Sequence, residues 1–404
     1  MAGRILLITD GIAALSYTPA LLQLMRREGM TVRLSPTGYD GASALTFVSE
    51  LAWAGLSGHP CLPIEHLDLK ALHEAEAVVA APVSLPVLKV LLRGSTLRLL
   101  QQAARPVILV PALLPDAVAD AAVRAEVEEQ AAMLPPGSAL LWPNADETIP
   151  LGAMGSLAAI PPESTLELAA GAVSSRPLSG MRLLLTAGPT VEDFDPVRFI
   201  SNRSTGKMGA AIALAACRMG ANVTMIHGPL AVKIPRLPAL TRLPLRSAQQ
   251  MYEAVMAHCT EADIAVLCAA VADFKPVEYA VNKIKKDGNA GLVMPLERTC
   301  DILATLGALP RPQRPFLVGF AAESNDVRDN AVGKLCRKHC DMLCCNDIKA
   351  AGCGFATDTN RVDIYRADGT VESLPLLSKM ETAQRILQTA AAELAKSPHH
   401  VPEQ

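Results

Sequence analysis

Residues 264–286 carry charged groups of the types that bind a polyphosphate. Asp273 follows an apolar run, 264–272, and Lys283 and Lys285 belong to the segment 282–286, which has three lysines in four positions. A nucleoside triphosphate with Mg²⁺ needs a carboxylate near the metal and cations near the phosphates. Each of these charges, taken alone, is also consistent with a solvated surface loop.

A second basic pair lies on a predicted helix. Lys334 and Lys338 are four residues apart, so both side chains lie on one helix face. The strand-like run 318–323, which contains a glycine turn, precedes them. A solvated helix face is again the alternative for this pair alone, and the order of the segments along the chain is the stronger signal.

The loop 195–209 is rich in Ser, Asn, Thr and Gly and leads into an apolar helix predicted over 210–219. The first turn of a helix has unpaired N–H groups, and Arg203 and Lys207 add positive charge. An anionic group is therefore a suitable ligand there. A capped helix start with solvated basic side chains is the alternative.

The elements that must position these groups alternate between strand-like and helical runs. Apolar strand-like segments occur at 4–9, 31–35, 77–81 and 106–110, and a similar series begins at Met181. In it, strand 183–187 ends in a turn that contains Gly188, and crevice ligands of open α/β sheets bind at such strand ends. Alternation of this kind predicts parallel sheets covered by helices on both faces. We expect an α/β fold with two doubly wound, Rossmann-like domains.

The domain boundary is predicted from composition. Residues 161–180 are rich in Ser, Pro, Gly and Ala with little periodicity, which is typical of a linker. We therefore expect an N-terminal domain over residues 1–165, a linker over 166–180 and a C-terminal domain over 181–396, with a frayed end.

Composition excludes several classes of protein. The 404 residues are 50% hydrophobic and 19% charged with a net charge of −3, which argues against disorder and against a general nucleic-acid surface. The longest apolar runs are shorter than the roughly 20 residues of a membrane span. The first residues do not resemble a signal peptide, and the ten cysteines show no disulfide framework. We expect a cytoplasmic protein that binds neither nucleic acid nor membrane.

The ordered motifs of the second half are similar to a known family. TAGPT, DPVRFISNRSTGKMG, AAVADFKP, KIKK, VGFAAE, a KLxxK helix, CCND, GFATDTNRV and LPLLSK follow one another over residues 181–390. This series resembles the phosphopantothenate-cysteine ligase domain of bacterial fused coenzyme A biosynthesis proteins. The resemblance implies that 4′-phosphopantothenate is activated by CTP with Mg²⁺ as an acyl-cytidylate, and that the amine of cysteine then displaces CMP.

The resemblance also implies roles for particular residues. Asn202 corresponds to the group that holds the acyl-cytidylate, Lys283 to a residue that neutralises the triphosphate, and Asp273 to a ligand of the metal or nucleotide. The role of Arg203 stays open, and no motif distinguishes CTP from ATP. The resemblance also assigns nucleotide binding to six further residues: Gly188, Lys285, Phe320, Ala321, Lys334 and Lys338.

A cysteine-rich stretch at 336–345 offers a competing interpretation as a metal site. Cys336, Cys340 and Cys344 are spaced four residues apart, and His339 lies among them. Cys344 and Cys345 fall on a predicted strand, however, where a free cysteine packs as a small apolar residue. We favour a role in the core.

The first half resembles the flavin-dependent phosphopantothenoylcysteine decarboxylase that is usually fused ahead of this ligase. Residues 5–14 resemble its first strand and phosphate turn, and His66 matches its active-site histidine. Pro86 and Leu114 stand where the family has asparagines, and the flap 143–152 lacks the expected cysteine. These changes remove a substrate-binding group and a proton donor, so we expect a vestigial decarboxylase site, and we leave FMN binding open.

Three functions remain distinguishable at this point. The leading one is a ligase whose N-terminal, flavoprotein-like domain lacks decarboxylase activity. The second is a fully bifunctional enzyme that uses FMN, and the third is a non-catalytic scaffold for other coenzyme A enzymes. The resemblance further implies a homo-oligomer, in which ligase domains pair as dimers and N-terminal domains associate as trimers, so that a dodecamer is one possible assembly.

Overall fold

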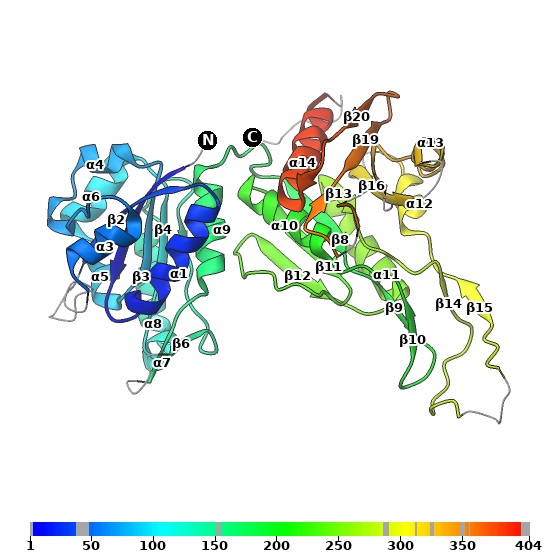
Figure 1. Ribbon diagram of the computed structural model, residues 1–404, viewed down its shortest axis with the longest axis horizontal. Helices are drawn as coiled ribbons and strands as arrows, with labels where there is room; N and C mark the ends of the chain where they lie inside the picture. Colours follow the sequence, from blue (N-terminus) through cyan, green and yellow to red (C-terminus); the bar gives the residue numbers. More distant parts are fainter. Residues whose placement is uncertain are drawn as a thin grey trace. The chain divides into compact units, whose positions relative to one another are not determined.

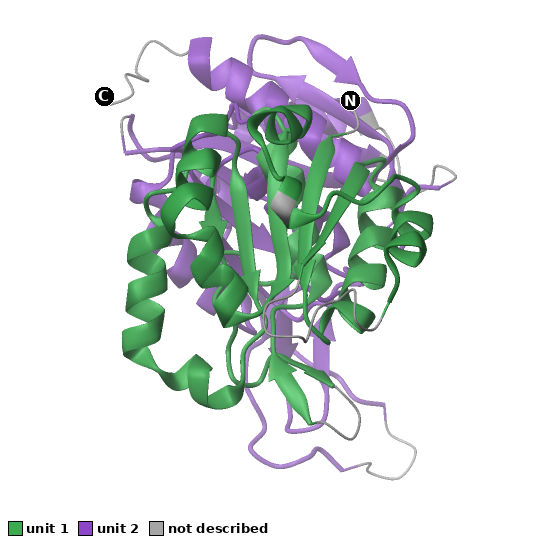
Figure 2. Cartoon of the chain, turned by 90° about the vertical axis from the view of Figure 1, so that its left-hand side faces the viewer, with its two compact units in different colours: residues 1–175, 235–238 green, residues 176–234, 239–404 purple. Residues whose placement is uncertain are grey.

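The computed structural model describes residues 3–37, 48–150, 155–285, 291–311, 313–323, 327–347, 352–354 and 356–396. The chain divides into two compact units, coloured separately in Figure 2. Unit 1 contains residues 1–175 and 235–238, and unit 2 contains residues 176–234 and 239–404. Each unit is an α/β structure with its own sheet (Figure 1), as the alternating pattern of the sequence predicts.

Unit 1 is built on a five-stranded parallel sheet. The strand order is β2 (Thr31–Thr37), β1 (Arg4–Asp10), β3 (Ala77–Val83), β4 (Val107–Pro111) and β5 (Ala139–Leu140). Successive side chains of β1 are buried on opposite faces of the sheet. Ile5 and Leu7 pack on one face, and Leu6 and Ile8 pack on the other. A strand that is buried on both faces is typical of a doubly wound sheet.

Helices cover both faces of the unit 1 sheet. One core includes residues of α1 (Ala14–Arg27), α3 (Glu50–Ser57) and α9 (Pro162–Val173). The other includes residues of α4 (Leu69–Glu74), α5 (Leu85–Leu91), α6 (Gly94–Ala103) and α8 (Ala121–Ala131). The smaller elements of this unit are η1 (Ile64–His66), α7 (Pro115–Ala119), β6 (Thr148–Pro150) and β7 (Ser156–Ala158).

The sequence predicts an irregular linker over residues 166–180, but residues 166–173 are helical. Helix α9 begins at Pro162 and ends at Val173, and its Leu166, Ala169 and Ala170 are buried in the unit 1 core. The small Ala and Gly residues of this helix allow it to lie close to the sheet. They also give a weak amphipathic pattern, so the segment resembles an unstructured one in the sequence. The two units divide after residue 175, within the range that was predicted as a linker.

Unit 2 contains an eight-stranded sheet. The order is β12 (Leu240–Pro244), β11 (Asn222–His227), β8 (Arg182–Ala187), β13 (Ile264–Leu267), β16 (Phe316–Glu323), β17 (Met342–Asp347), β19 (Val362–Arg366) and β20 (Val371–Ser373). The first six strands are parallel, and the last two are antiparallel additions at one edge.

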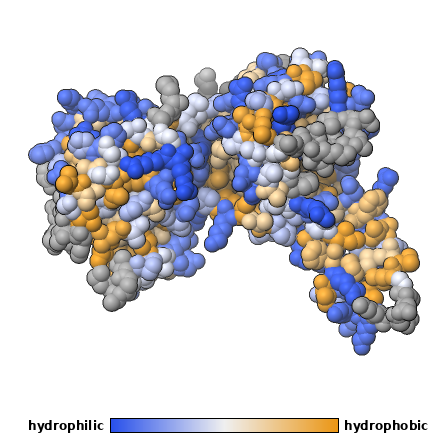
Figure 3. All heavy atoms as spheres, in the orientation of Figure 1, coloured by the Kyte–Doolittle hydropathy of each residue, from blue (hydrophilic) through white to orange (hydrophobic). Residues whose placement is uncertain are grey.

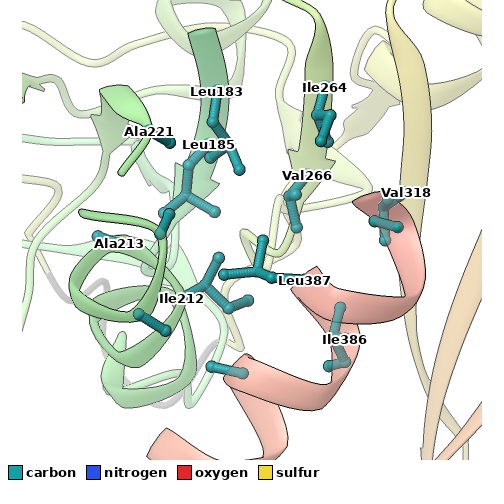
Figure 4. Packing of buried hydrophobic residues seen from close by; sticks show 14 of the residues in the cluster. Leu183, Leu185, Ile212, Ala213, Ala221, Ile264, Val266, Val318, Ile386 and Leu387 are labelled. Carbon is teal, nitrogen blue, oxygen red and sulfur yellow. The ribbon is translucent and has the colours of Figure 1, made fainter. Parts of the chain in front are cut away.

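The unit 2 sheet is also covered on both faces. Figure 4 shows Leu185 of β8 near Ile212 of α10 (Lys207–Arg218) and Leu387 of α14 (Lys379–Lys396), with Leu183 further along the strand in the same core. These four side chains are at most 1% exposed, and each contributes roughly 1.5–3 kcal/mol through burial. The other face packs against α11 (Ala248–His258), η3 (Cys259–Glu261), α12 (Ile302–Gly307) and α13 (Val327–Arg337).

Two further parts of unit 2, residues 191–201 and the described residues of 274–298 (274–285 and 291–298), extend away from the sheet, and we call them the arm (Figure 1). The first holds the antiparallel strands β9 (Val191–Asp193) and β10 (Phe199–Ser201). The second holds β14 (Phe274–Pro276) and β15 (Leu296–Arg298). The buried Asp195 joins the two segments, because its carboxylate accepts from the amides of Val197 and Arg198 at 2.8 Å and of Ile284 at 3.2 Å. The short pair β18 (Thr359–Asn360) and β21 (Leu377–Ser378) lies elsewhere in unit 2.

Candidate functional site

Unit 2 contains a pocket of about 930 Å³ where several parallel strands end. Residues at or just beyond the carboxyl ends of β8, β13 and β16 line it, together with the first turn of α10 and the last turn of α13. This is where open α/β sheets bind ligands. Seven of the nine residues that the sequence proposed for the C-terminal site line this one pocket: Gly188, Asn202, Asp273, Phe320, Ala321, Lys334 and Lys338.

Glycines allow α10 to begin close to the sheet. Gly206 has φ +75° and precedes the helix, and a Cβ at this position would lie 2.3 Å from the Leu230 side chain. At Gly209 a Cβ would lie 2.4 Å from the Cβ of Ala187 at the end of β8. The first turn of α10 is therefore held against the strand end, and its N–H groups lie beside the pocket, as the sequence predicts for an anion site.

Asn202 is fixed by two hydrogen bonds to the backbone. Its Nδ2 donates to the carbonyl oxygens of Ala270 and Val271, each at 3.0 Å. Two carbonyl acceptors identify the nitrogen of the amide, which leaves Oδ1 as the atom that can accept a hydrogen bond from a ligand. The side chain is exposed and lines the pocket, in agreement with its predicted place in the site.

Lys334 and Lys338 lie at the side of the pocket formed by α12 and α13. The Lys334 Nζ donates to the carbonyl oxygen of Phe320 at 2.9 Å, and Lys338 forms an ion pair with Asp301. Burial raises the pKa of Asp301, but the hydrogen bonds from Lys338 and from the Ala304 amide outweigh burial, and its pKa lies below the ordinary value. Asp301 is therefore a carboxylate at neutral pH, and it holds Lys338 at the pocket wall.

Lys379 is a pocket residue that the sequence interpretation missed. It is 7% exposed and begins α14, and its Nζ donates to the carbonyl oxygens of Gly354 at 3.1 Å, Thr357 at 2.5 Å and Thr359 at 3.4 Å. Burial lowers the pKa of Lys379. A lysine in the first turn of an amphipathic helix opposes the helix dipole, and this unfavourable placement was the signal available in the sequence.

Lys207 holds the same loop from the opposite side. Its Nζ donates to the carbonyl oxygen of Ala356 at 2.7 Å and to Oδ1 of Asp358 at 2.6 Å. The loop 354–360 contributes Gly354 and Asn360 to the pocket lining, so two lysines at the starts of α10 and α14 determine the position of one pocket wall. The sequence had predicted Lys207 only as a charge near a helix start.

Asp273 supplies a carboxylate at the pocket mouth. It is exposed, lines the pocket and forms no ion pair with a described residue. The described residues contain no group of three or more His, Cys, Asp or Glu that could hold a metal ion. An Mg²⁺ ion held by one or two carboxylates and by ligand phosphates does not require such a group. Asp273 and the neighbouring Asp301 fit that mode of binding.

Lys283 and Lys285 do not line the pocket in this structure. Both side chains are exposed on the arm, and Lys286, the last lysine of the KIKK motif, lies outside the described residues. Their charge and the resemblance of the KIKK motif to the ligase family placed them with the triphosphate. The structure separates them from the other predicted site residues, and their role stays a prediction.

The cysteine-rich stretch contributes to the core, as expected. Cys344 and Cys345 of β17 are 0% and 1% exposed, and Cys340 is 4% exposed. Burial raises the pKa of the Cys340 thiol to about 12. Each of the ten cysteines of the chain is a free thiol in the structure.

The vestigial site predicted in unit 1 consists of exposed residues. His66 ends the short helix η1, and Leu114 is 65% exposed at the start of α7. A leucine side chain cannot form a hydrogen bond with a carboxylate, and the loss of the decarboxylase site stays a prediction. Residues 151 and 152 of the predicted flap lie outside the described residues.

The fold and the pocket together define the class of protein. It is an open α/β protein whose ligand site lies at the carboxyl ends of parallel strands and has a cationic lining. No helix in the described part of the chain is long and apolar enough to cross a membrane.

Comparison with known proteins then gives the family. Residues 178–394 match the DNA/pantothenate metabolism flavoprotein C-terminal domain. The coenzyme A biosynthesis bifunctional protein CoaBC of Bacillus subtilis is 35% identical over 96% of this chain and 97% of its own length. The Escherichia coli CoaBC protein is 34% identical over 96% of both chains. The solved C-terminal domain of a CoaBC protein is 41% identical, covers 55% of this chain and 100% of its own, and has a TM-score of 0.47. The chain belongs to the family of bacterial bifunctional coenzyme A biosynthesis proteins.

Proposed function

We propose that unit 2 ligates 4′-phosphopantothenate with cysteine, using CTP, through an acyl-cytidylate intermediate. The observation that carries this proposal is that one pocket collects the separate motif residues: Gly188, Asn202, Asp273, Phe320, Ala321, Lys334 and Lys338. These residues come from segments up to 150 positions apart, since Gly188 and Lys338 both belong to the lining. The full-length similarity to coenzyme A biosynthesis proteins supports the same assignment.

The pocket offers different chemistry at its two sides. The nucleotide binds at the side formed by Phe320, Lys334 and Lys338. The two lysines can neutralise the charge that develops on the leaving pyrophosphate. Phosphopantothenate binds at the other side, beside the first turn of α10 and the lysines Lys207 and Lys379. The N–H groups of the helix and the two cations suit its phosphate. Lys207 and Lys379 act there chiefly by fixing the loop 354–360.

The reaction has two balanced steps. A carboxylate oxygen of phosphopantothenate attacks the α-phosphorus of CTP, and pyrophosphate leaves as the new oxygen–phosphorus bond forms. The cysteine nitrogen then attacks the acyl carbon and CMP leaves, so that an amide is made and a proton is released. Asn202 Oδ1, an acceptor beside the intermediate, orients it by accepting a hydrogen bond.

Mg²⁺ bound with CTP would neutralise part of the triphosphate charge. Asp273 and Asp301 are the carboxylates of the pocket that would hold it. In the absence of Mg²⁺, Asp301 stays paired with Lys338. This pairing keeps the lysine in place before the nucleotide enters.

Unit 1 is proposed to lack decarboxylase activity. Leu114 replaces a hydrogen-bonding residue, and Cys61 is the only cysteine of residues 1–175. Cys61 is 7% exposed and lies outside the flap 143–152 in the sequence, so it does not stand in for the missing proton donor. The second candidate is a bifunctional enzyme, which the similarity to proteins named bifunctional along 96% of the chain favours.

The arm supports the proposal of a ligase dimer. Among the described residues, half of the 18 large exposed hydrophobic side chains lie on it, and Figure 3 shows the hydrophobic colour gathered there. Val281 and Val293 are 79% and 91% exposed. Apolar surface of this kind marks a binding surface, and a second copy of the chain is the partner we propose. Light scattering should give a smaller assembly for a Val281→Asp, Val293→Asp double variant than for the wild type.

The ligase proposal is tested by pyrophosphate release from the purified full-length chain with phosphopantothenate, cysteine and either CTP or ATP. We expect release that needs phosphopantothenate and is faster with CTP. No release with either nucleotide would favour the scaffold function instead.

The free thiols of all ten cysteines agree with the proposed cytoplasmic location.

A further inference from the structure

A buried aspartate ends the first strand of unit 1. Asp10 is the last residue of β1, in the interior of the parallel sheet, and it is 4% exposed. In open α/β sheets this strand end and the turn after it bind the phosphate of a nucleotide. FMN carries a phosphate dianion, so whether unit 1 can hold FMN depends on the charge at this turn.

The Asp10 carboxylate uses the donors that a phosphate would need. It accepts hydrogen bonds from the hydroxyl of Ser84 and, at 3.4 Å, from the Ser84 amide, which follows the end of β3. The amide of Gly11 also donates to it. Burial raises the pKa of Asp10, and these hydrogen bonds partly oppose the change.

The turn has kept a shape that would admit a ligand. Gly11 has φ +69°, and a Cβ added there would meet no atom within 4 Å. There is open space beside Gly11, and the charge of Asp10 is the obstacle that the structure shows. A phosphate placed beside Asp10 would face a like charge in a poorly solvated position, and it would find the Ser84 and Gly11 amides already bonded.

The described segments that follow the neighbouring strands supply no base to compensate for the carboxylate. The segments that follow β1, β3 and β4, residues 11–16, 84–88 and 112–117, contain no Lys or Arg. Lys89 is the next base after Ser84, and it pairs with Glu126 at 3.1 Å. The unit 1 residue Arg236 donates to both carboxylate oxygens of Glu147, at 3.1 and 2.9 Å.

We propose that the Asp10 carboxylate occupies the anion position at the end of β1 and thereby excludes FMN from unit 1. The turn retains the form of a phosphate site, but an internal anion has replaced the external one. This inference concerns unit 1 alone and does not depend on ligase activity.

The test compares FMN with riboflavin, which has the same ring system and no phosphate. Each flavin is titrated with the full-length chain and binding is followed by flavin fluorescence, for the wild type, Asp10→Asn and Asp10→Ser. Asp116→Asn is the matched control, because Asp116 is exposed in the first turn of α7 near the same end of the sheet. Circular dichroism confirms that each variant is folded.

We expect the wild type to be purified without flavin and to show no preference for FMN over riboflavin. Removing the charge at position 10 should raise the affinity for FMN relative to riboflavin by about 10-fold or more, and the Asp116 variant should not. Stoichiometric FMN in the wild-type protein would overturn the proposal. An unchanged FMN-to-riboflavin ratio in both Asp10 variants would overturn it as well.

Discussion

Replacement of Lys379 by methionine tests how the pocket wall is held. The Nζ of Lys379 donates to three carbonyl oxygens of the loop 354–360, at 2.5, 3.1 and 3.4 Å. Methionine keeps most of the side-chain volume but removes these donors. The carbonyl groups of the loop then turn to solvent, and the wall formed by Gly354 and Asn360 loses its fixed position.

The size of the effect follows from those contacts. A hydrogen bond from a charged donor contributes about 1.5–3 kcal/mol, and the contact at 3.4 Å is weak. Burial of the ammonium group costs part of this gain. A net loss of about 2–3 kcal/mol in the anchoring of the loop would make the competent pocket roughly 30- to 150-fold less populated, which is an upper limit for the change in affinity.

The assay is pyrophosphate release at saturating CTP and cysteine with increasing phosphopantothenate. The KM for phosphopantothenate should rise, by up to the factor above. The KM for CTP should change much less, because the proposed arrangement assigns the loop held by Lys379 to phosphopantothenate and assigns Lys334 and Lys338 to the nucleotide. Lys379→Arg should recover part of the loss, since its guanidinium group can donate to the same carbonyls.

The matched control is Lys396→Met at the other end of α14, where the side chain is 69% exposed and pairs with Glu393. This variant should behave like the wild type. If the folded Lys379→Met protein keeps a KM for phosphopantothenate within threefold of the wild-type value, the reasoning about the loop is refuted.

Three other outcomes follow from the structure. Asn202→Ala should release more pyrophosphate than ligated product, because the acyl-cytidylate is no longer held and hydrolyses; a ratio of one would contradict its role. Gly209→Ala should destabilise unit 2 by about 1–3 kcal/mol through contact with Ala187, seen by circular dichroism, while the fluorescence of both tryptophans, which lie in unit 1, keeps its transition. Asp10→Asn should raise the melting temperature of unit 1 at pH 7. The pKa of Asp10 is raised in the folded protein, so its charge destabilises the fold at pH values above that pKa. This destabilisation disappears as the pH falls toward the unfolded pKa near 3.8. Tryptophan fluorescence at pH 4 and pH 7 measures the difference, and an equal gain at both values would argue against a buried charge.

The fold of each unit was accessible from the sequence because its central strands are apolar along most of their length. Runs such as Ala77–Val83, which is buried at every position, have no polar alternation and indicate a sheet covered on both faces. Helix α9 was missed for the opposite reason. Its Ala and Gly residues allow close packing but give a weak hydrophobic pattern, and its N-terminal prolines resemble a linker.

The site was predictable where a motif residue lies directly after a strand or on a helix that follows one. Gly188 and Asn202 satisfy this condition, and both line the pocket. Lys283 does not line the pocket, because its charge is visible in the sequence while the path of the arm is not, and its role stays a prediction. Lys379 was missed because it acts through backbone carbonyls that are about 20 residues away, and no spacing rule gives such contacts.

Mass spectrometry of the reaction product tests the central claim most directly. The purified chain is incubated with phosphopantothenate, cysteine, CTP and Mg²⁺, with FMN added in a parallel sample. The account predicts phosphopantothenoylcysteine as the final product in both samples. A product that has also lost carbon dioxide would contradict the proposed absence of decarboxylase activity, and unchanged phosphopantothenate would contradict the ligase itself.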